Sequence, residues 1–229
     1  MGVFFDTLER VLYKPDLFEN LDVVRSVIPA GLAGRKKARN VMLNHEGLKS
    51  VVGATMRPGV TFPVVKVPDQ TGQVRDHANL WTPPGLGRRP GKPKEWLGMV
   101  YHVFPDQKAR DFFLDMLAWI VQHPDQRLGI VFILLGAQGI GKDMIFEQII
   151  RVFGSQNVAV LEENELNGNF TSFLTKQIVC LQEVKLTKAT YRRLKGWTGQ
   201  NAGKVRINEK YGAQYEIDPV ANIMATGNE

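Results

Sequence analysis

The sequence predicts an α/β fold with a mainly parallel sheet flanked by helices, preceded by a smaller α+β region. From residue 95 onward, short apolar runs alternate with amphipathic segments, as strands and helices do in parallel α/β domains. Residues 130–135 form a continuous apolar run, which is typical of a strand that is covered on both faces. Residues 1–94 instead hold nine of the twelve prolines. We therefore divide the chain into residues 1–94 and 95–229.

The N-terminal region predicts few regular elements. Four early apolar residues suggest a first helix: Val3, Leu8, Val11 and Leu12. Residues 51–67 carry β-branched side chains interrupted by proline and glycine, which predicts short irregular strands. Residues 84–94 resemble a basic connector without regular structure. We expect residues 1–94 to form a collar, a linker or an oligomerisation region.

The C-terminal region predicts a regular succession of elements. Residues 107–122 place apolar side chains at helical spacing, and His123-Pro124 ends that helix. Further helices are expected over residues 143–153, which Gly154 would cap, and over 187–197. Strands are expected over residues 130–135, 158–161, 177–181 and 221–225, and a hairpin over 204–208 and 214–217.

Composition excludes several classes of protein. The hydrophobic fraction of 44% argues against wholesale disorder. A single cysteine, Cys180, excludes an internal disulfide framework and most zinc sites built from thiolates. The longest mostly apolar run, residues 128–137, is about half of the ~20 residues that a membrane-spanning helix needs. We expect a cytoplasmic protein without a membrane partner. The net charge of +6 suggests a polyanionic partner.

A glycine-rich segment after the first expected strand of this region fits the pattern G-x-x-x-x-G-K. In such a loop the backbone N–H groups turn onto phosphate oxygens, and the following helix adds positive potential. We therefore predict a site for ATP with Mg²⁺, in which Lys142 reaches the terminal phosphates. The predicted nucleotide-binding residues are Gly136, Ala137, Gln138, Gly139, Ile140, Gly141, Lys142, Asp143 and Met144.

Two carboxylates are expected beside the phosphates. Asp143 occupies the position where a serine or threonine hydroxyl usually binds magnesium, and Glu183 follows the strand over 177–181. We predict both as Mg²⁺ ligands, with Asp143 compensating for Gln182, where an acid is usual. Asn228 follows the last strand and would face the γ-phosphate. Lys142, Glu183 and Asn228 are the predicted catalytic residues.

Between residues 185 and 210 lie eight basic residues and one acidic residue, a net charge of +7. Trp197 and Tyr211 are interleaved with them, a mixture that suits a grip on single-stranded DNA. The predicted DNA-binding residues are Lys195, Lys204, Arg206 and Lys210. The alternative interpretation is a solvated basic face.

Residues 79–229 resemble the superfamily-3 helicase domain of phage, plasmid and viral primase-helicase proteins. The segments that carry the resemblance are Asn79-Leu80-Trp81-Thr82-Pro83-Pro84, Leu117-Ala118-Trp119, His123-Pro124, Gly136 to Asp143, Asn169-Phe170-Thr171-Ser172-Phe173, Leu181-Gln182-Glu183-Val184, Leu194-Lys195, Arg206-Ile207-Asn208-Glu209-Lys210-Tyr211-Gly212 and Ala225-Thr226-Gly227-Asn228. The resemblance implies a P-loop NTPase core of the AAA+ type, a hexameric ring and ATP-driven translocation on single-stranded DNA. Lys142 would then be the Walker A lysine, Glu183 the Walker B glutamate, Lys210 part of the DNA-contacting hairpin region and Asn228 the sensor.

The same resemblance implies a phage- or prophage-encoded replication protein in a bacterial host, often with a primase or polymerase domain upstream. In that family an arginine finger follows the sensor, whereas this chain stops at Glu229. We therefore expect the chain to be truncated after the sensor and to hydrolyse ATP weakly, since such an arginine is worth roughly 10³–10⁵ in rate. Two alternatives remain open: a catalytically weak nucleotide-binding protein that assembles rings, or another DNA motor ATPase for packaging or initiation.

Overall fold

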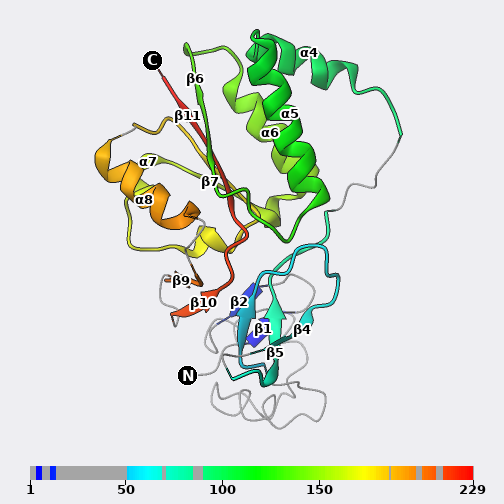
Figure 1. The fold of residues 1–229 in the computed structure, drawn as a ribbon, viewed down its shortest axis with the longest axis vertical. Helices are drawn as coiled ribbons and strands as arrows, with labels where there is room; N and C mark the ends of the chain where they lie inside the picture. The colour runs from blue at the N-terminus through cyan, green and yellow to red at the C-terminus, as the bar shows by residue number, and fades with distance from the viewer. Residues whose placement is uncertain are drawn as a thin grey trace, which may run out of the picture. The chain divides into compact units, whose positions relative to one another are not determined.

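The computed structural model describes residues 51–68, 71–84, 90–185, 187–199, 203–209 and 214–228, together with the backbone of two strands at 4–6 and 11–13. These residues fall into two units (Figure 1). In the described ranges, the smaller unit contains residues 4–6, 11–13, 51–55 and 62–80, and the larger unit contains 56–61 and most residues from 81 onward. The functional division expected at residue 94 stays a prediction.

The smaller unit contains β-structure where a first helix was expected. Strands β1 (Phe4–Asp6) and β2 (Val11–Tyr13) pair antiparallel. The helix prediction is therefore wrong for these residues, because two short runs of aromatic and aliphatic residues favour strands over a continuous helix. A second sheet has the order β3-β5-β4, with β3 (Gly53–Thr55) parallel and β4 (Val64–Pro68) antiparallel to β5 (Val74–Asn79). Short strands within residues 51–67 are thereby confirmed.

A four-stranded parallel sheet forms the centre of the larger unit. Its order is β6-β11-β8-β7, from strands β6 (Val131–Leu135), β7 (Val158–Leu161), β8 (Ile178–Leu181) and β11 (Asn222–Gly227). Gly227 lies opposite Leu135, and Ala225 lies opposite Leu181. Because all four strands run in the same direction, their carboxyl ends meet at one edge. The predicted mainly parallel sheet is confirmed.

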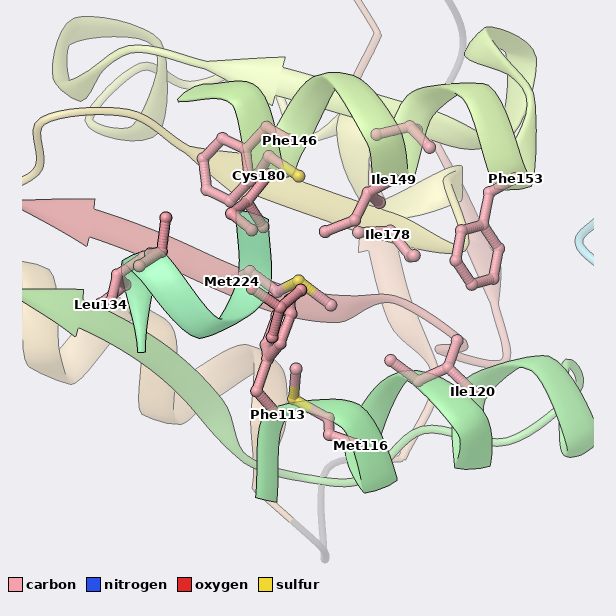
Figure 2. Close-up of a cluster of buried hydrophobic side chains, with 14 of the residues drawn as sticks. Phe113, Met116, Ile120, Leu134, Phe146, Ile149, Phe153, Ile178, Cys180 and Met224 are labelled. Atoms are coloured by element: carbon pink, nitrogen blue, oxygen red, sulfur yellow. The ribbon is translucent and has the colours of Figure 1, made fainter. Parts of the chain in front are cut away.

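Three helices supply the core on one face of this sheet: α4 (Lys94–Val103), α5 (Gln107–Gln122) and α6 (Lys142–Phe153). Figure 2 shows Phe113 and Ile120 of α5 and Phe146 of α6 gathered around Ile178 and Met224 of the sheet. All five side chains are buried. Alternate residues of each strand point to this cluster, since side chains in a strand alternate between its two faces.

The opposite face is covered by α8 (Lys188–Thr198), by the short helix α7 (Glu163–Leu166), and by the antiparallel hairpin of β9 (Val205–Ile207) and β10 (Tyr215–Ile217). Val179 and Leu181 of β8 pack there against Leu194 of α8 and Ile207 of β9. Two 3₁₀ turns, Ser155–Asn157 and Ser172–Thr175, complete the connections. No helix within the described ranges is both long and apolar enough to cross a bilayer.

Strand β6 differs from the expectation that both of its faces are covered. Phe132 and Leu134 face the helices α4–α6, as predicted. On the other face, however, Ile133 is 38% exposed and Leu135 is 50% exposed. On that side the expectation holds only for Val131, which packs against the core under α8 and the hairpin. Ile133 and Leu135 stay exposed because β6 is the last strand of the described sheet. A continuous apolar run thus indicates a strand without distinguishing an edge position from a central one.

Candidate functional site

The glycine-rich loop joins β6 directly to α6. The strand ends at Leu135 and the helix begins at Lys142, so the predicted strand–loop–helix arrangement is confirmed. Gly139 and Gly141 have φ angles of +82° and +92°. These left-handed conformations strain any residue with a Cβ atom, which explains glycine at both positions. The loop therefore has the backbone form that can direct N–H groups toward an anion.

Lys142 turns back over this loop and is 8% exposed. Its Nζ donates to the carbonyl oxygens of Gly136 at 2.6 Å and Ala137 at 2.9 Å. A third hydrogen bond, of 3.0 Å, goes to Oδ1 of Asn228. The structure thus brings together two predicted catalytic residues that are 86 positions apart in the chain.

The end of β11 organises the acidic position next to it. Thr226 is buried, and its Oγ1 accepts a hydrogen bond of 3.2 Å from the backbone N–H of Glu183. The carbonyl oxygen of Thr226 accepts a second bond, of 2.9 Å, from the N–H of Val184. Sequence reasoning missed Thr226; its available signal was its place just before Gly227 and Asn228 at the end of an apolar strand. Thr226 positions the backbone that carries Glu183.

Glu183 is exposed and has a φ angle of +51°. Among the described residues it is the only one other than glycine with a positive φ. Such a conformation costs free energy and often occurs at functional positions. The neighbouring Gln182 uses its backbone N–H to reach the carbonyl oxygen of Leu161 at 2.8 Å, continuing the link between β8 and β7.

The predicted magnesium ligands offer a sparse donor set. Asp143 and Met144 lie exposed in the first turn of α6, and Glu183 follows β8. In the part of the chain that the structure describes, no three His, Cys, Asp or Glu side chains gather as a metal site. Any ion held by Asp143 and Glu183 would therefore complete its shell with oxygens from phosphate and water, as Mg²⁺ commonly does.

The basic segment presents part of its charge to solvent. Three predicted cations are exposed: Lys195 of α8, Lys204 just before β9, and Arg206 of β9. The predicted Lys210 lies outside the described residues. Glu216 of β10 is the cross-strand partner of Arg206, so an acid stands opposite this cation.

One aromatic residue of this segment differs from its expected role, and another was missed. Trp197 is partly buried and meets the ring of Phe173 edge-on at 5.2 Å, so it contributes to packing. Tyr191 is 63% exposed and stands on the outer face of α8 between exposed cations. Helical spacing could have identified Tyr191 in the sequence. Lys188 precedes it by three positions and Lys195 follows it by four, so both lie beside it on the helix surface, and Arg192 is the next residue.

Two comparisons of sequence bear on this arrangement. A family model described as a family of unknown function (DUF5906) matches residues 134–229, the part that contains the loop, Glu183 and Asn228. The chain is also 28% identical over 163 residues to a DNA primase-polymerase of Nitratiruptor phage NrS-1. The matched stretch covers 67% of this chain and 22% of that relative.

Solved structures of the NrS-1 C-terminal region have a similar fold. One apo structure superposes with a TM-score of 0.73 at 20% identity, and covers 100% of this chain and 54% of that chain. Another gives a TM-score of 0.66 at 22% identity over 85% of this chain and 47% of that chain. The chain thus spans about half the length of these structures. At this level of identity the likeness shows the fold alone.

These comparisons overturn the interpretation of the chain as a superfamily-3 helicase and P-loop ATPase. The matching family model has no assigned function, and the curated relative is named a DNA primase-polymerase. These relatives therefore do not support the descriptions of the chain as a helicase, an ATP-binding protein or a hydrolase. A phage origin and a role in DNA replication fit the name of the NrS-1 relative. The motifs misled because a glycine loop with a lysine specifies a backbone geometry, which does not determine the reaction. The hexameric ring rested on that resemblance and stays a prediction.

Proposed function

We propose that the larger unit is a P-loop nucleotide-binding module of a phage-type DNA-replication protein. It binds a nucleoside triphosphate with Mg²⁺, ATP being the predicted ligand, at the loop from Gly136 to Lys142. The DNA partner binds at the exposed basic surface of α8 and β9. The proposal concerns binding and assigns no helicase or hydrolase activity to the chain.

The observation that carries this proposal is the environment of the Lys142 ammonium. Lys142 as a whole residue is only 8% exposed, and the three hydrogen-bond acceptors of its ammonium are neutral oxygens. Within the described ranges, no carboxylate forms an ion pair with it. A buried charge is costly unless an opposite charge compensates it. A phosphate group seated in the adjoining glycine loop would supply that compensation.

The N-terminus of α6 supports the same conclusion. The first N–H groups of a helix lack partners within the helix and point along its axis, where they attract anions. In this helix Gly141 is the N-terminal cap and no side chain caps the first turn. The first amide groups of α6 and the Lys142 side chain therefore lie in one region, at the carboxyl end of β6.

Magnesium fits the donors available beside this region. When bound, Mg²⁺ neutralises charge on the phosphate oxygens, which offsets the repulsion that Asp143 would otherwise exert. Asp143 and Glu183 both supply oxygen donors, the ligand type that Mg²⁺ prefers. Asn228 accepts a hydrogen bond from Lys142 and helps to hold its ammonium over the start of the loop, at Gly136 and Ala137.

The DNA part of the proposal rests on charge and on the relative. Helix α8 carries four cations and no acidic residue, and Lys188, Arg192 and Lys195 are exposed. A cationic helix face with an exposed aromatic ring suits the phosphates and bases of single-stranded DNA. The curated relative is a DNA primase-polymerase, which makes DNA a fitting partner.

Titration calorimetry tests the nucleotide part. We expect the wild-type chain to bind ATP more tightly with Mg²⁺ than without it. Asp143→Asn should reduce that enhancement, because an amide does not compensate the metal charge. Asp115→Asn, which changes an exposed acid of α5, serves as the matched control and should keep the enhancement. If the wild-type chain binds neither ATP nor inorganic tripolyphosphate, the proposed function is wrong.

A further inference from the structure

A pocket lies between α4 and α6, beside the glycine loop. Its volume is about 570 Å³, within the range of about 300–1,000 Å³ that small-molecule sites occupy. Helix α4, which forms one wall, was not expected from the sequence. The residues that line the pocket are Lys92, Pro93, Lys94, Glu95, Trp96, Met99, Met144, Gln148 and Arg151.

The lining combines an aromatic and thioether wall with polar and cationic groups. Trp96 is partly buried, and its ring lies 6.3 Å from that of Phe113, which holds one side of the indole in the core. Met99 is also packed against the core, whereas Met144 is 52% exposed. An indole and flexible thioethers provide the flat apolar contact that a purine or pyrimidine ring requires. Gln148 adds an amide that can both donate and accept hydrogen bonds.

Charge at the pocket favours a ligand with an anionic end. Three cations and one acid line it, which sums to a net charge of +2. Lys92, Lys94 and Arg151 are all exposed, so they stand toward solvent rather than inside the apolar wall. This arrangement suits a nucleotide, whose base is apolar on its faces and whose phosphates are negative.

Met144 links the wall of the pocket to the end of the glycine loop. This residue lines the pocket, and its Sδ lies 3.9 Å from the position that a Cβ atom on Gly141 would occupy. Val103 at the end of α4 lies 3.6 Å from the same position. Met144, Gln148 and Arg151 follow one another along a single face of α6, leading away from the loop. If the phosphates of a ligand bind in the loop, the rest of that ligand can therefore contact this face of α6.

We propose that this pocket binds the base and sugar of the nucleotide whose phosphates occupy the loop from Gly136 to Lys142. The inference rests on the proposed function, because the loop must hold the phosphates. The alternative occupant is a base of a DNA strand, because its ring has the same chemistry as the base of a free nucleotide. The free nucleotide is favoured since the pocket adjoins the loop at Gly141 and Met144, whereas the exposed cations of α8 belong to a helix that packs on the other face of the sheet.

The test compares ATP with inorganic tripolyphosphate, both with Mg²⁺, in the full 229-residue chain. In Met144→Ala/Gln148→Ala we expect ATP to bind about tenfold more weakly, because the variant removes apolar contact and an amide from the base. Tripolyphosphate should bind as it does to the wild type. Val152→Ala is the matched control, because Val152 is an exposed apolar residue of α6 that does not line the pocket.

Fluorescence gives a second readout that does not depend on truncating the wall. The chain has four tryptophans. We expect ATP, but not tripolyphosphate, to quench part of their emission, and we expect Trp96→Phe to lose that quench while still binding tripolyphosphate. Phenylalanine keeps an aromatic ring against Phe113, which protects the fold.

The outcomes separate the two proposals. Equal affinity of wild type and double variant for ATP, with tripolyphosphate still bound, overturns the base pocket and leaves the phosphate site intact. An equal loss for both ligands also overturns it, because the loop itself was then disturbed. If only the affinity for an oligothymidylate falls, the pocket belongs to DNA and the inference is wrong. Absence of any phosphate binding to the wild type removes the proposed function, and this inference with it.

Discussion

Replacement of Lys142 by methionine removes the ammonium while keeping a side chain of similar length. In the structure this ammonium donates three hydrogen bonds, of 2.6, 2.9 and 3.0 Å, to Gly136, Ala137 and Asn228. Methionine cannot donate to any of them. The loss of these hydrogen bonds destabilises the folded state. Removal of a positive charge that has no ion-pair partner among the described residues acts in the opposite direction. We expect the variant to fold and to lose phosphate binding selectively.

The size of the loss follows from the bond that phosphate would make. A hydrogen bond to a charged group contributes about 1.5–3 kcal/mol, and each 1.4 kcal/mol corresponds to a tenfold change in Kd. Lys142→Met should therefore bind ATP and tripolyphosphate roughly 10- to 150-fold more weakly. The loss should be equal for both ligands, because Lys142 acts on phosphate and not on the base.

Lys176 supplies a matched control. Its Nζ donates to the backbone carbonyl of Gln156 at 2.8 Å, and burial lowers its pKa. It precedes β8, at the sheet edge opposite the glycine loop. Lys176→Met removes a half-buried lysine of the same kind, and calorimetry should find wild-type affinity for ATP. If Lys142→Met binds ATP within threefold of wild type, or if both variants lose affinity equally, phosphate recognition by Lys142 is refuted.

Three further predictions concern strain, titration and DNA. Glu183→Gly should raise the free energy of unfolding by about 1 kcal/mol, because glycine adopts a left-handed φ without strain; urea denaturation that finds Glu183→Gln equally stabilised contradicts this reasoning. Burial raises the pKa of the Cys180 thiol to about 12 from an ordinary value of 9.0. The folded state therefore loses stability as pH rises from 9 to 12, by about 1.4 kcal/mol per pH unit relative to Cys180→Ala, and parallel pH profiles for the two proteins would exclude this. Tyr191→Ala should weaken binding of labelled oligothymidylate by about 1–3 kcal/mol in fluorescence anisotropy, whereas Tyr101→Ala, at a similarly exposed tyrosine of α4, should not.

Much of the larger unit is predictable because its signals are local. The helix expected over residues 107–122 has those bounds in the structure, since apolar spacing defines it and His123-Pro124 stops it. Gly154 follows α6 as its C-cap, as expected, with a φ of +82° that glycine adopts without strain. The strands over 158–161 and 177–181 are likewise found within one residue of their expected limits. In each case a periodic apolar pattern and a breaker lie close together in the chain.

The parts that were not predictable depend on contacts between distant segments. Lys142 and Asn228 were both expected near the terminal phosphates, but their direct hydrogen bond was not. That bond depends on the parallel pairing of β6 and β11, which brings the start of α6 close to the end of β11. The positive φ of Glu183 is fixed by Thr226 on the adjacent strand, and no propensity of glutamate indicates it. Exposure of Tyr191 rather than Trp197 depends on which side of α8 meets the hairpin.

The distinction between binding and reaction explains why the fold was predicted more securely than the activity. Phosphate binding by a glycine-rich loop depends mainly on backbone N–H groups. The residues from Gly136 to Lys142 are adjacent in the chain, so the local sequence is enough to predict such a loop. Hydrolysis additionally requires an acid that holds water in line with the terminal phosphate and a cation that stabilises the transition state. Here Gln182 stands where an acid is usual, Glu183 is carried on a strained backbone, and the relative with a named activity is a primase-polymerase. Phosphate binding is therefore the activity that we propose for the loop, and the groups around Glu183 are where measurements on a reaction should begin.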